Sequence, residues 1–150
     1  MGMFDALDVS ATGLTAERLR MDVTAENLAN AQTTRGADGQ PYRRKEVVLS
    51  EVQQGGFGAQ LAKAVGAGSA SGGQPGGVEV SGITQDQTPG KLVYDPGHPD
   101  ADAKGYVRMP NVDTVAEMVD LISASRAYEA NVTAMNSAKQ MFSKTLDLLR

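Results

Sequence analysis

The residues best suited to chemistry lie together at residues 95–102. Asp95, His98, Asp100 and Asp102 place three carboxylates and the chain's single imidazole within eight residues. Carboxylate oxygens and imidazole nitrogens are ligands for divalent cations. The segment that starts at Asp100 also begins like a calcium-binding loop and reaches a glycine, Gly105, at its sixth position. A metal site is therefore the first hypothesis for this cluster.

Two departures from the calcium-loop pattern argue against that hypothesis. Lys104 occupies the fifth position, where an oxygen ligand is needed, and Asn111 occupies the twelfth, where a bidentate Glu belongs. Pro96 and Pro99 instead predict a rigid connector whose Asp side chains accept hydrogen bonds from nearby backbone groups. We favour the connector and expect no bound metal.

Catalysis has no support elsewhere in the sequence. His98 could act as a general base, but no nucleophile or orienting partner accompanies it. The chain has no cysteine, no Gly-x-Ser-x-Gly motif and no phosphate-binding loop. The net charge of −4 argues against nucleic-acid binding, which needs a basic surface. We therefore expect a protein that is not an enzyme, uses no cofactor and binds no nucleic acid.

The sequence also predicts neither a cleavable secretory signal nor a membrane span. The N-terminus has no basic region followed by a continuous apolar core. No stretch approaches the roughly 20 apolar residues that a transmembrane helix requires. Direct insertion into a membrane is therefore not expected.

Two helices, predicted at the ends of the chain, would form the main packing surfaces. Over residues 4–30, seven of eight positions spaced alternately by three and four are apolar, and over residues 118–149 eight of ten are. That spacing is the heptad pattern of a seam-forming helix. Asn111 and Asp113 precede a Thr114–Glu117 capping box that would start the second helix. The seam residues expected to pack are Phe4, Leu7, Leu14, Met21, Leu28, Met118, Leu121, Tyr128, Val132, Met135, Phe142, Leu146 and Leu149.

The middle of the chain has a different composition. Residues 41–50, 78–83 and 91–94 are typical of short strands and predict one small antiparallel unit. Residues 55–77 contain nine glycines, which predicts a flexible loop. We expect a mainly α fold with a small β insertion, whose two long terminal helices form an antiparallel coiled-coil hairpin. The divisions are an N-terminal axial helix (1–34), a β-rich central region (35–110) and a C-terminal axial helix (111–150).

Apolar residues outside the predicted seams indicate association. The off-seam residues are Val9, Leu19 and Val23 in the first helix and Val115, Val119, Ile122 and Leu148 in the second. A two-helix hairpin covers one stripe on each helix, so these residues would face water unless neighbouring subunits buried them. A self-contained helical hairpin and a soluble cytoplasmic coiled-coil adaptor that binds partner helices are the alternatives.

Three asparagines, Asn27, Asn30 and Asn131, interrupt or end the apolar helices. They are either ordinary cap and surface residues or polar groups that fix the register of a helix interface by hydrogen bonding. The sequence leaves both interpretations open.

Ordered motifs at both ends of the chain resemble the family of flagellar rod and hook axial proteins. Residues 11–20 (ATGLTAERLR) and 25–33 (AENLANAQT) resemble the N-terminal motif of that family, and residues 41–45 (PYRRK) its next basic stretch. Residues 95–102 (DPGHPDAD), 105–112 (GYVRMPNV), 117–120 (EMVD), 126–132 (RAYEANV) and 146–149 (LDLL) are similar to its proximal-rod members. The matched positions are Asn27, Asn30, Asp95, Pro96, His98, Pro99, Asp100, Gly105, Tyr106, Pro110, Asn111, Glu129 and Asn131.

The resemblance implies a structural subunit of the bacterial flagellar basal-body proximal rod, the drive shaft that transmits torque. Its partners would be copies of itself and other rod proteins, from the proximal and distal rod and the basal-body base. It would be exported by the flagellar type III apparatus, without a cleavable signal peptide, to a rod that spans the periplasm. The glycine-rich middle is not part of the match.

Overall fold

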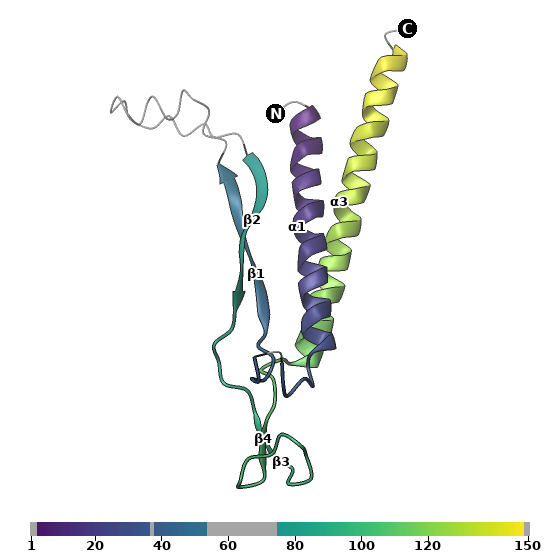
Figure 1. The fold of residues 1–150 in the computed structure, drawn as a ribbon. Coiled ribbons are helices and arrows are strands. Elements are labelled where there is room, and N and C mark those ends of the chain that lie inside the picture. The colour runs from purple at the N-terminus through teal and green to yellow at the C-terminus, as the bar shows by residue number, and fades with distance from the viewer. Residues whose placement is uncertain (1–2, 37, 54–74, 149–150) are drawn as a thin grey trace, which may run out of the picture.

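The computed structural model describes residues 3–36, 38–53 and 75–148, which form two long helices and two small antiparallel sheets (Figure 1). The helices are α1 (Met3–Ala29) and α3 (Thr114–Leu148). The strands are β1 (Lys45–Gln53), β2 (Pro75–Gln85), β3 (Leu92–Tyr94) and β4 (Tyr106–Arg108). The predicted mainly α fold with a small β component is confirmed.

The two helices pack side by side and run in opposite directions (Figure 1). α3 has 35 residues against 27 in α1, and its C-terminal end extends past the start of α1 (Figure 1). Gly13 lies against Asn131, because a Cβ atom placed on Gly13 would come within 3.0 Å of the Asn131 side-chain nitrogen. Whether the two helices supercoil around each other stays a prediction.

The buried positions of the helices differ in phase from the predicted stripes. In α3, Ala124 and Ala138 are buried, and each precedes by one residue a polar break in the predicted stripe, Ser125 and Lys139. In α1, Val23 is buried although it was expected off the seam. Small side chains let the two helix backbones approach closely. The face on which α1 and α3 contact each other is therefore set by close backbone packing and not by the largest apolar side chains.

The strands form two separate two-stranded sheets instead of the single antiparallel unit that was predicted. β1 pairs with β2, and β3 pairs with β4, a strand that the sequence did not predict. The last residues of the predicted loop, 75–77, belong to β2, and the remainder of that loop lies outside the described residues. A bulge between Val48 and Leu49 interrupts the pairing of β1 with β2.

The β1–β2 ribbon lies along α1, on the side away from α3 (Figure 1). An isolated two-stranded ribbon is marginally stable in water, so this contact with the helix supports it. Near one end of the ribbon, the Thr12 hydroxyl accepts a hydrogen bond from the Val78 amide at 3.2 Å. Gly77 has a φ of 88° and packs so closely on Thr12 that any side chain at this position would clash.

Large side chains contribute little to the interior. The buried hydrophobic residues among those described are Ala16, Val23, Val107, Ala124 and Ala138, and they are joined inside by the polar residues Thr24, Asn27 and Glu117. No helix in the described part of the chain is long and apolar enough to cross a membrane.

Candidate functional site

The most highly connected group in the described structure is the amide of Asn27, near the C-terminal end of α1. The Asn27 side chain is 1 % exposed. Its Nδ2 donates to the Lys45 carbonyl at 2.8 Å and to Glu117 Oε2 at 3.0 Å. Its Oδ1 accepts from the Lys45 backbone N–H and from the Tyr42 hydroxyl, both at 2.9 Å. All four hydrogen-bonding positions of the amide are therefore used.

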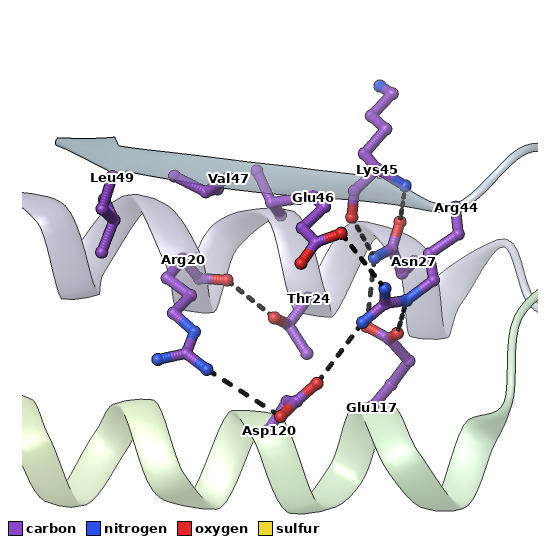
Figure 2. Close-up of a pocket in the computed structure, with 11 residues that line it drawn as sticks. Arg20, Thr24, Asn27, Arg44, Lys45, Glu46, Val47, Leu49, Glu117 and Asp120 are labelled. Atoms are coloured by element: carbon purple, nitrogen blue, oxygen red, sulfur yellow. Dashed lines mark hydrogen bonds and ion pairs between the residues drawn. The ribbon is translucent and has the colours of Figure 1, made fainter. Parts of the chain in front are cut away.

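These bonds join three parts of the chain. Asn27 belongs to α1, Lys45 begins β1, and Glu117 lies in the first turn of α3 (Figure 2). By pairing with both the N–H and the C=O of Lys45, the Asn27 amide acts like a neighbouring strand residue and attaches β1 to α1. The asparagine interpretation left open by the sequence is thus resolved for Asn27, which is a buried tertiary contact and not a cap.

We call the hydrogen-bonded cluster of Asn27, Tyr42, Arg44 and Glu117 the joint. Glu117 is its buried carboxylate. It is 1 % exposed, and its Oε1 accepts a hydrogen bond from Arg44 Nε at 2.5 Å. Removing a charge from water is unfavourable unless the charge is paired and hydrogen-bonded, and Glu117 meets both conditions. The hydrogen bond to Glu117 raises the pKa of the Arg44 guanidinium above its ordinary value, and burial of the guanidinium acts in the opposite direction.

Further charges surround the Arg44–Glu117 pair. Arg44 also lies 3.5 Å from Asp120 and 3.7 Å from Glu46, and Asp120 lies 3.9 Å from Arg20 of α1 (Figure 2). These outer pairs are partly exposed, so each contributes little by itself. Together with Val23, Val47 and Leu49 they line a cavity of about 240 Å³ between α1, β1 and α3. Each arginine of this cluster is paired with carboxylates from another part of the chain, so the charges hold these parts together. The paired side chains of the cluster do not offer a free acid or base for catalysis.

Tyr42 adds a second link between α1 and the segment before β1. Burial, followed by the negative charges of Glu26 and Glu117, raises the pKa of the Tyr42 hydroxyl to about 12. The Lys45 ammonium lies 5.9 Å from the centre of the Tyr42 ring and pairs with Glu26 at 2.5 Å. The phenol is therefore neutral at physiological pH, and its hydroxyl donates a hydrogen bond to Asn27 Oδ1.

The start of α3 explains why Glu117 is available for the joint. The Asp113 carboxylate accepts a hydrogen bond from the Val115 amide at 3.0 Å, and the Asp113 carbonyl accepts the first helical bond, from the Glu117 amide. Asp113 is thus the N-cap, so the predicted Thr114–Glu117 capping box is wrong. Because the Glu117 side chain is not used in capping, it can turn toward Asn27 and Arg44.

Asn111 extends the joint toward the β segments. Its Oδ1 accepts a hydrogen bond from the Arg44 amide at 2.8 Å, and its Nδ2 donates to the Asp86 carbonyl at 3.4 Å. The Asp86 carboxylate accepts bonds from the hydroxyl and amide of Thr88, which lower the Asp86 pKa below its usual range. Asn111 therefore bridges the residues just before β1 and just after β2.

The Asp and His side chains of residues 95–102, considered above as a metal site, form turns and one contact with a distant part of the chain. Asp95 accepts a hydrogen bond from the Gly97 amide at 3.1 Å, and His98 Nδ1 accepts one from the Asp100 amide at 3.1 Å. Asp100 accepts from the Thr34 hydroxyl at 2.8 Å and pairs with Arg35. Within the described residues, no group of three or more potential ligands converges on one point. The connector interpretation accounts for these contacts.

The remaining motif residues are dispersed. Gly105, with a φ of 78°, turns the chain into β4, and Tyr106 stacks edge-on against Tyr94 with ring centres 5.3 Å apart. Pro110 is buried and Glu129 is exposed. Asn30 follows the last residue of α1, and its side chain donates a hydrogen bond to the Glu26 carbonyl of that helix. Pro96 and Pro99 lie exposed in the connector.

The predicted seam residues fall into three groups. Leu7, Leu14, Met21, Leu28, Leu121, Tyr128, Val132 and Met135 are half-buried. Met118, Phe142 and Leu146 are exposed. The side chain of Phe4 and the whole of Leu149 lie outside the described part. The part that these residues play between subunits stays a prediction.

Sequence reasoning missed three members of the joint: Tyr42, Arg44 and Glu117. Tyr42 and Arg44 were noted only within a motif, and Glu117 was assigned to a cap. The available signal was the asparagine inside an apolar helix, because a buried amide requires partners from elsewhere in the chain.

Comparisons with known proteins cover nearly the whole chain. Residues 7–37 match the family model for the flagella basal body rod protein, and residues 103–148 match the model for the flagellar basal body rod FlgEFG protein C-terminal region. The flagellar basal-body rod protein FlgC of Bacillus subtilis is 51 % identical over 152 residues, covering 99 % of both chains. The FlgC proteins of Escherichia coli O157:H7 (48 % over 148 residues, 99 % of this chain and 98 % of the relative) and Borreliella burgdorferi (46 % over 156 residues, 100 % and 99 %) are similar along their length.

Proposed function

The chain belongs to the family of FlgC flagellar basal-body rod proteins, and from this premise we propose how it works. It is a structural subunit of the flagellar basal-body rod. Its mechanism is packing: α1 and α3 join neighbouring subunits, and the polar joint holds the β segments to those helices. The proposal extends to a place in the proximal rod and to the transmission of torque.

The observation that carries the proposal is where the large apolar side chains lie. The interior of the helix pair is made of small and polar residues, whereas Val115, Met118, Val119 and Ile122 on α3 are between 46 % and 64 % exposed. Met141 and Leu146 are also more than half exposed. Burial of apolar surface contributes about 25 cal/mol per Å². These side chains stay exposed in the separate chain, so they are available for burial between chains.

The joint gives such a subunit stiffness. Buried, fully satisfied polar networks hold a single geometry, because any displacement leaves a polar group without its partner. Asn27, Arg44 and Glu117 connect α1, α3 and the start of β1 in this way. A torque applied to the helices would then be passed to the β segments with little bending.

Several finer features belong to the proposal. The helix pair acts as an antiparallel coiled-coil hairpin, and the chain divides at about residues 34 and 110. The partners are copies of this chain, other proximal and distal rod proteins and the basal-body base. Export uses the flagellar type III apparatus without a cleavable signal, and the rod spans the periplasm.

A cytoplasmic coiled-coil adaptor is the rival function. It is disfavoured because the similarity to named rod proteins extends over both helices and the connector, and not only over a coiled-coil repeat.

Gene deletion and complementation test the proposed function. A strain that lacks this chain should be non-motile and should have incomplete basal bodies, and the wild-type chain should restore both. Cryo-electron microscopy of purified basal bodies should then locate the chain in the proximal rod. Complete basal bodies in the deletion strain would refute the rod assignment.

A further inference from the structure

The helix pair presents two long exposed stripes, one on each helix. On α1 six of the exposed positions are spaced alternately by four and three residues, which keeps these six on one narrow face. They are Ala11, Thr15, Arg18, Asp22, Ala25 and Ala29. This face is turned from both neighbours of α1. At 100° per residue, Gly13, which contacts Asn131 of α3, lies about 200° around the helix from Ala11, and Thr12, which bonds Val78 of β2, lies about 100° from it.

α3 carries a stripe with the same spacing. Its members, a subset of the exposed positions of α3, are Val115, Val119, Ile122, Arg126, Glu129, Thr133, Asn136 and Gln140. The buried residues Ala124 and Ala138, which lie on the side facing α1, are on the opposite side of this helix. The α1–α3 pair thus carries one such exposed stripe, its outward stripe, on each helix.

The two stripes are complementary in charge when they are placed antiparallel. With Ile122 beside Ala25, Arg126 falls beside Asp22, and Glu129 falls beside Arg18. None of these four charged side chains forms an ion pair within the part of the chain that the structure describes. Opposite charges in register favour one partner and one alignment over others.

The stripes are also complementary in size. In the same alignment Ile122 and Val119, which are 55 % and 62 % exposed, face the small residues Ala25 and Ala29. Large side chains on one helix thereby fill the space above small ones on the other. The antiparallel order repeats that of α1 and α3 within the chain, so the contact would continue the helix pair into an array.

We propose that the outward stripe of α3 docks on the outward stripe of α1 in a second copy of this chain, with Arg126 against Asp22 and Glu129 against Arg18. The inference rests on the proposed function and specifies which faces meet and in which register. Two different faces meet, so the contact is heterologous and propagates into a ring or a helix. This is the kind of symmetry that a shaft needs.

Disulfide cross-linking tests the register. The chain has no cysteine, so introduced thiols report only on the designed pair. Two differently tagged copies, Ala25→Cys and Ile122→Cys, are expressed together in the deletion strain and basal bodies are oxidised mildly. The expected product is a disulfide-linked dimer that carries both tags. A matched control combines Ala25→Cys with Gln140→Cys, which the alignment separates by about 27 Å of helix, far beyond disulfide reach.

Charge reversal tests the pairing. Arg126→Glu should reduce the number of completed basal bodies by about tenfold, because it sets two acids side by side, and adding Asp22→Arg in the same chain should restore most of the loss. Reversing the charge of Lys104, which is exposed in the connector, serves as the control and should have little effect on the number of completed basal bodies. Circular dichroism should show unchanged folding of each purified variant.

The outcomes separate this inference from the function on which it rests. If wild-type chain is absent from basal bodies, the proposed function fails. If wild-type chain is present but the mixed dimer does not form, or the Cys at position 122 links to a different protein, the docking of two copies is refuted. Failure of Asp22→Arg to rescue Arg126→Glu would refute the charge register.

Discussion

Replacing Asn27 by Ala should unfold the joint at the base of the two helices. The substitution removes all four hydrogen bonds of a side chain that is 1 % exposed. The Lys45 amide and carbonyl and one Glu117 oxygen then lose their partner in a largely enclosed space. Each such unsatisfied group costs about 1–3 kcal/mol. Because the nearby cavity admits some water, we expect a loss of about 3 kcal/mol in the free energy of unfolding.

Urea unfolding of dilute protein, followed by circular dichroism at 222 nm, measures this loss. Asn30→Ala is the matched control, because the Asn30 side chain has local partners: it donates to the Glu26 carbonyl and accepts from the Thr33 hydroxyl. Its expected loss is below about 1 kcal/mol. If the two alanine variants differ by less than about 1 kcal/mol, the joint does not stabilise the subunit as argued.

A second variant keeps the test informative if Asn27→Ala does not fold. Asn27→Asp preserves shape but loses both amide donors and places a carboxylate beside Glu117. Its stability should be lower than that of the wild-type protein at neutral pH, and the difference should shrink at acidic pH as the new carboxyl group binds a proton. A difference that does not depend on pH would contradict the contact with Glu117.

Three other predictions concern neighbouring features. Asp113→Ala should lower the unfolding free energy by about 1 kcal/mol because the N-cap of α3 is lost; a thermal melt that matches wild type would contradict it. Gly90→Ala should destabilise the β3–β4 region, since a Cβ atom there overlaps the Met109 carbonyl, and faster amide exchange in that region would show it. Tyr42 stabilises the fold in its neutral form, and its pKa is raised from 10.0 to about 12, so its contribution is complete below about pH 10 and is lost as pH rises through 12. The difference in unfolding free energy between wild type and Tyr42→Phe should therefore narrow between about pH 10 and pH 12.

The helices could be predicted because their signals are local and repeated. Apolar spacing by three and four residues over residues 4–28 and 118–149 predicts both helices, and the absence of Gly and Pro from residues 112–150 fits the length of α3. Which face meets the partner helix could not be read in the same way. Counting large apolar residues favours the face that buries the most area. The observed contact instead uses Gly13, Ala16 and Ala124, where the backbones can approach most closely.

The joint could not be predicted because its members are distant in the sequence. Asn27 and Glu117 are 90 residues apart, and no periodicity links them. The capping-box pattern also misassigned Glu117, since a local pattern cannot show that Asp113 already caps the helix. In the connector, the Asp95 side chain accepts a hydrogen bond from the amide two residues further on, so this turn could be predicted. The contacts of Asp100 with Thr34 and Arg35 join distant parts of the chain and could not be predicted.

The joint and the exposed stripes use different residues: one set holds the subunit together, and the other is left for contact with a neighbour. A subunit that reaches its place as a separate chain must hold its own shape without closing its apolar surface against itself. The polar joint and the small residues provide that shape, because they fix α1, α3 and β1 with hydrogen bonds and close backbone contacts. Val115, Val119 and Ile122 are thereby left for a neighbour. Replacing Ser125 by Leu would break this division by adding apolar area beside the intramolecular seam, and we expect it to stabilise the separate chain while leaving the outward stripes unchanged.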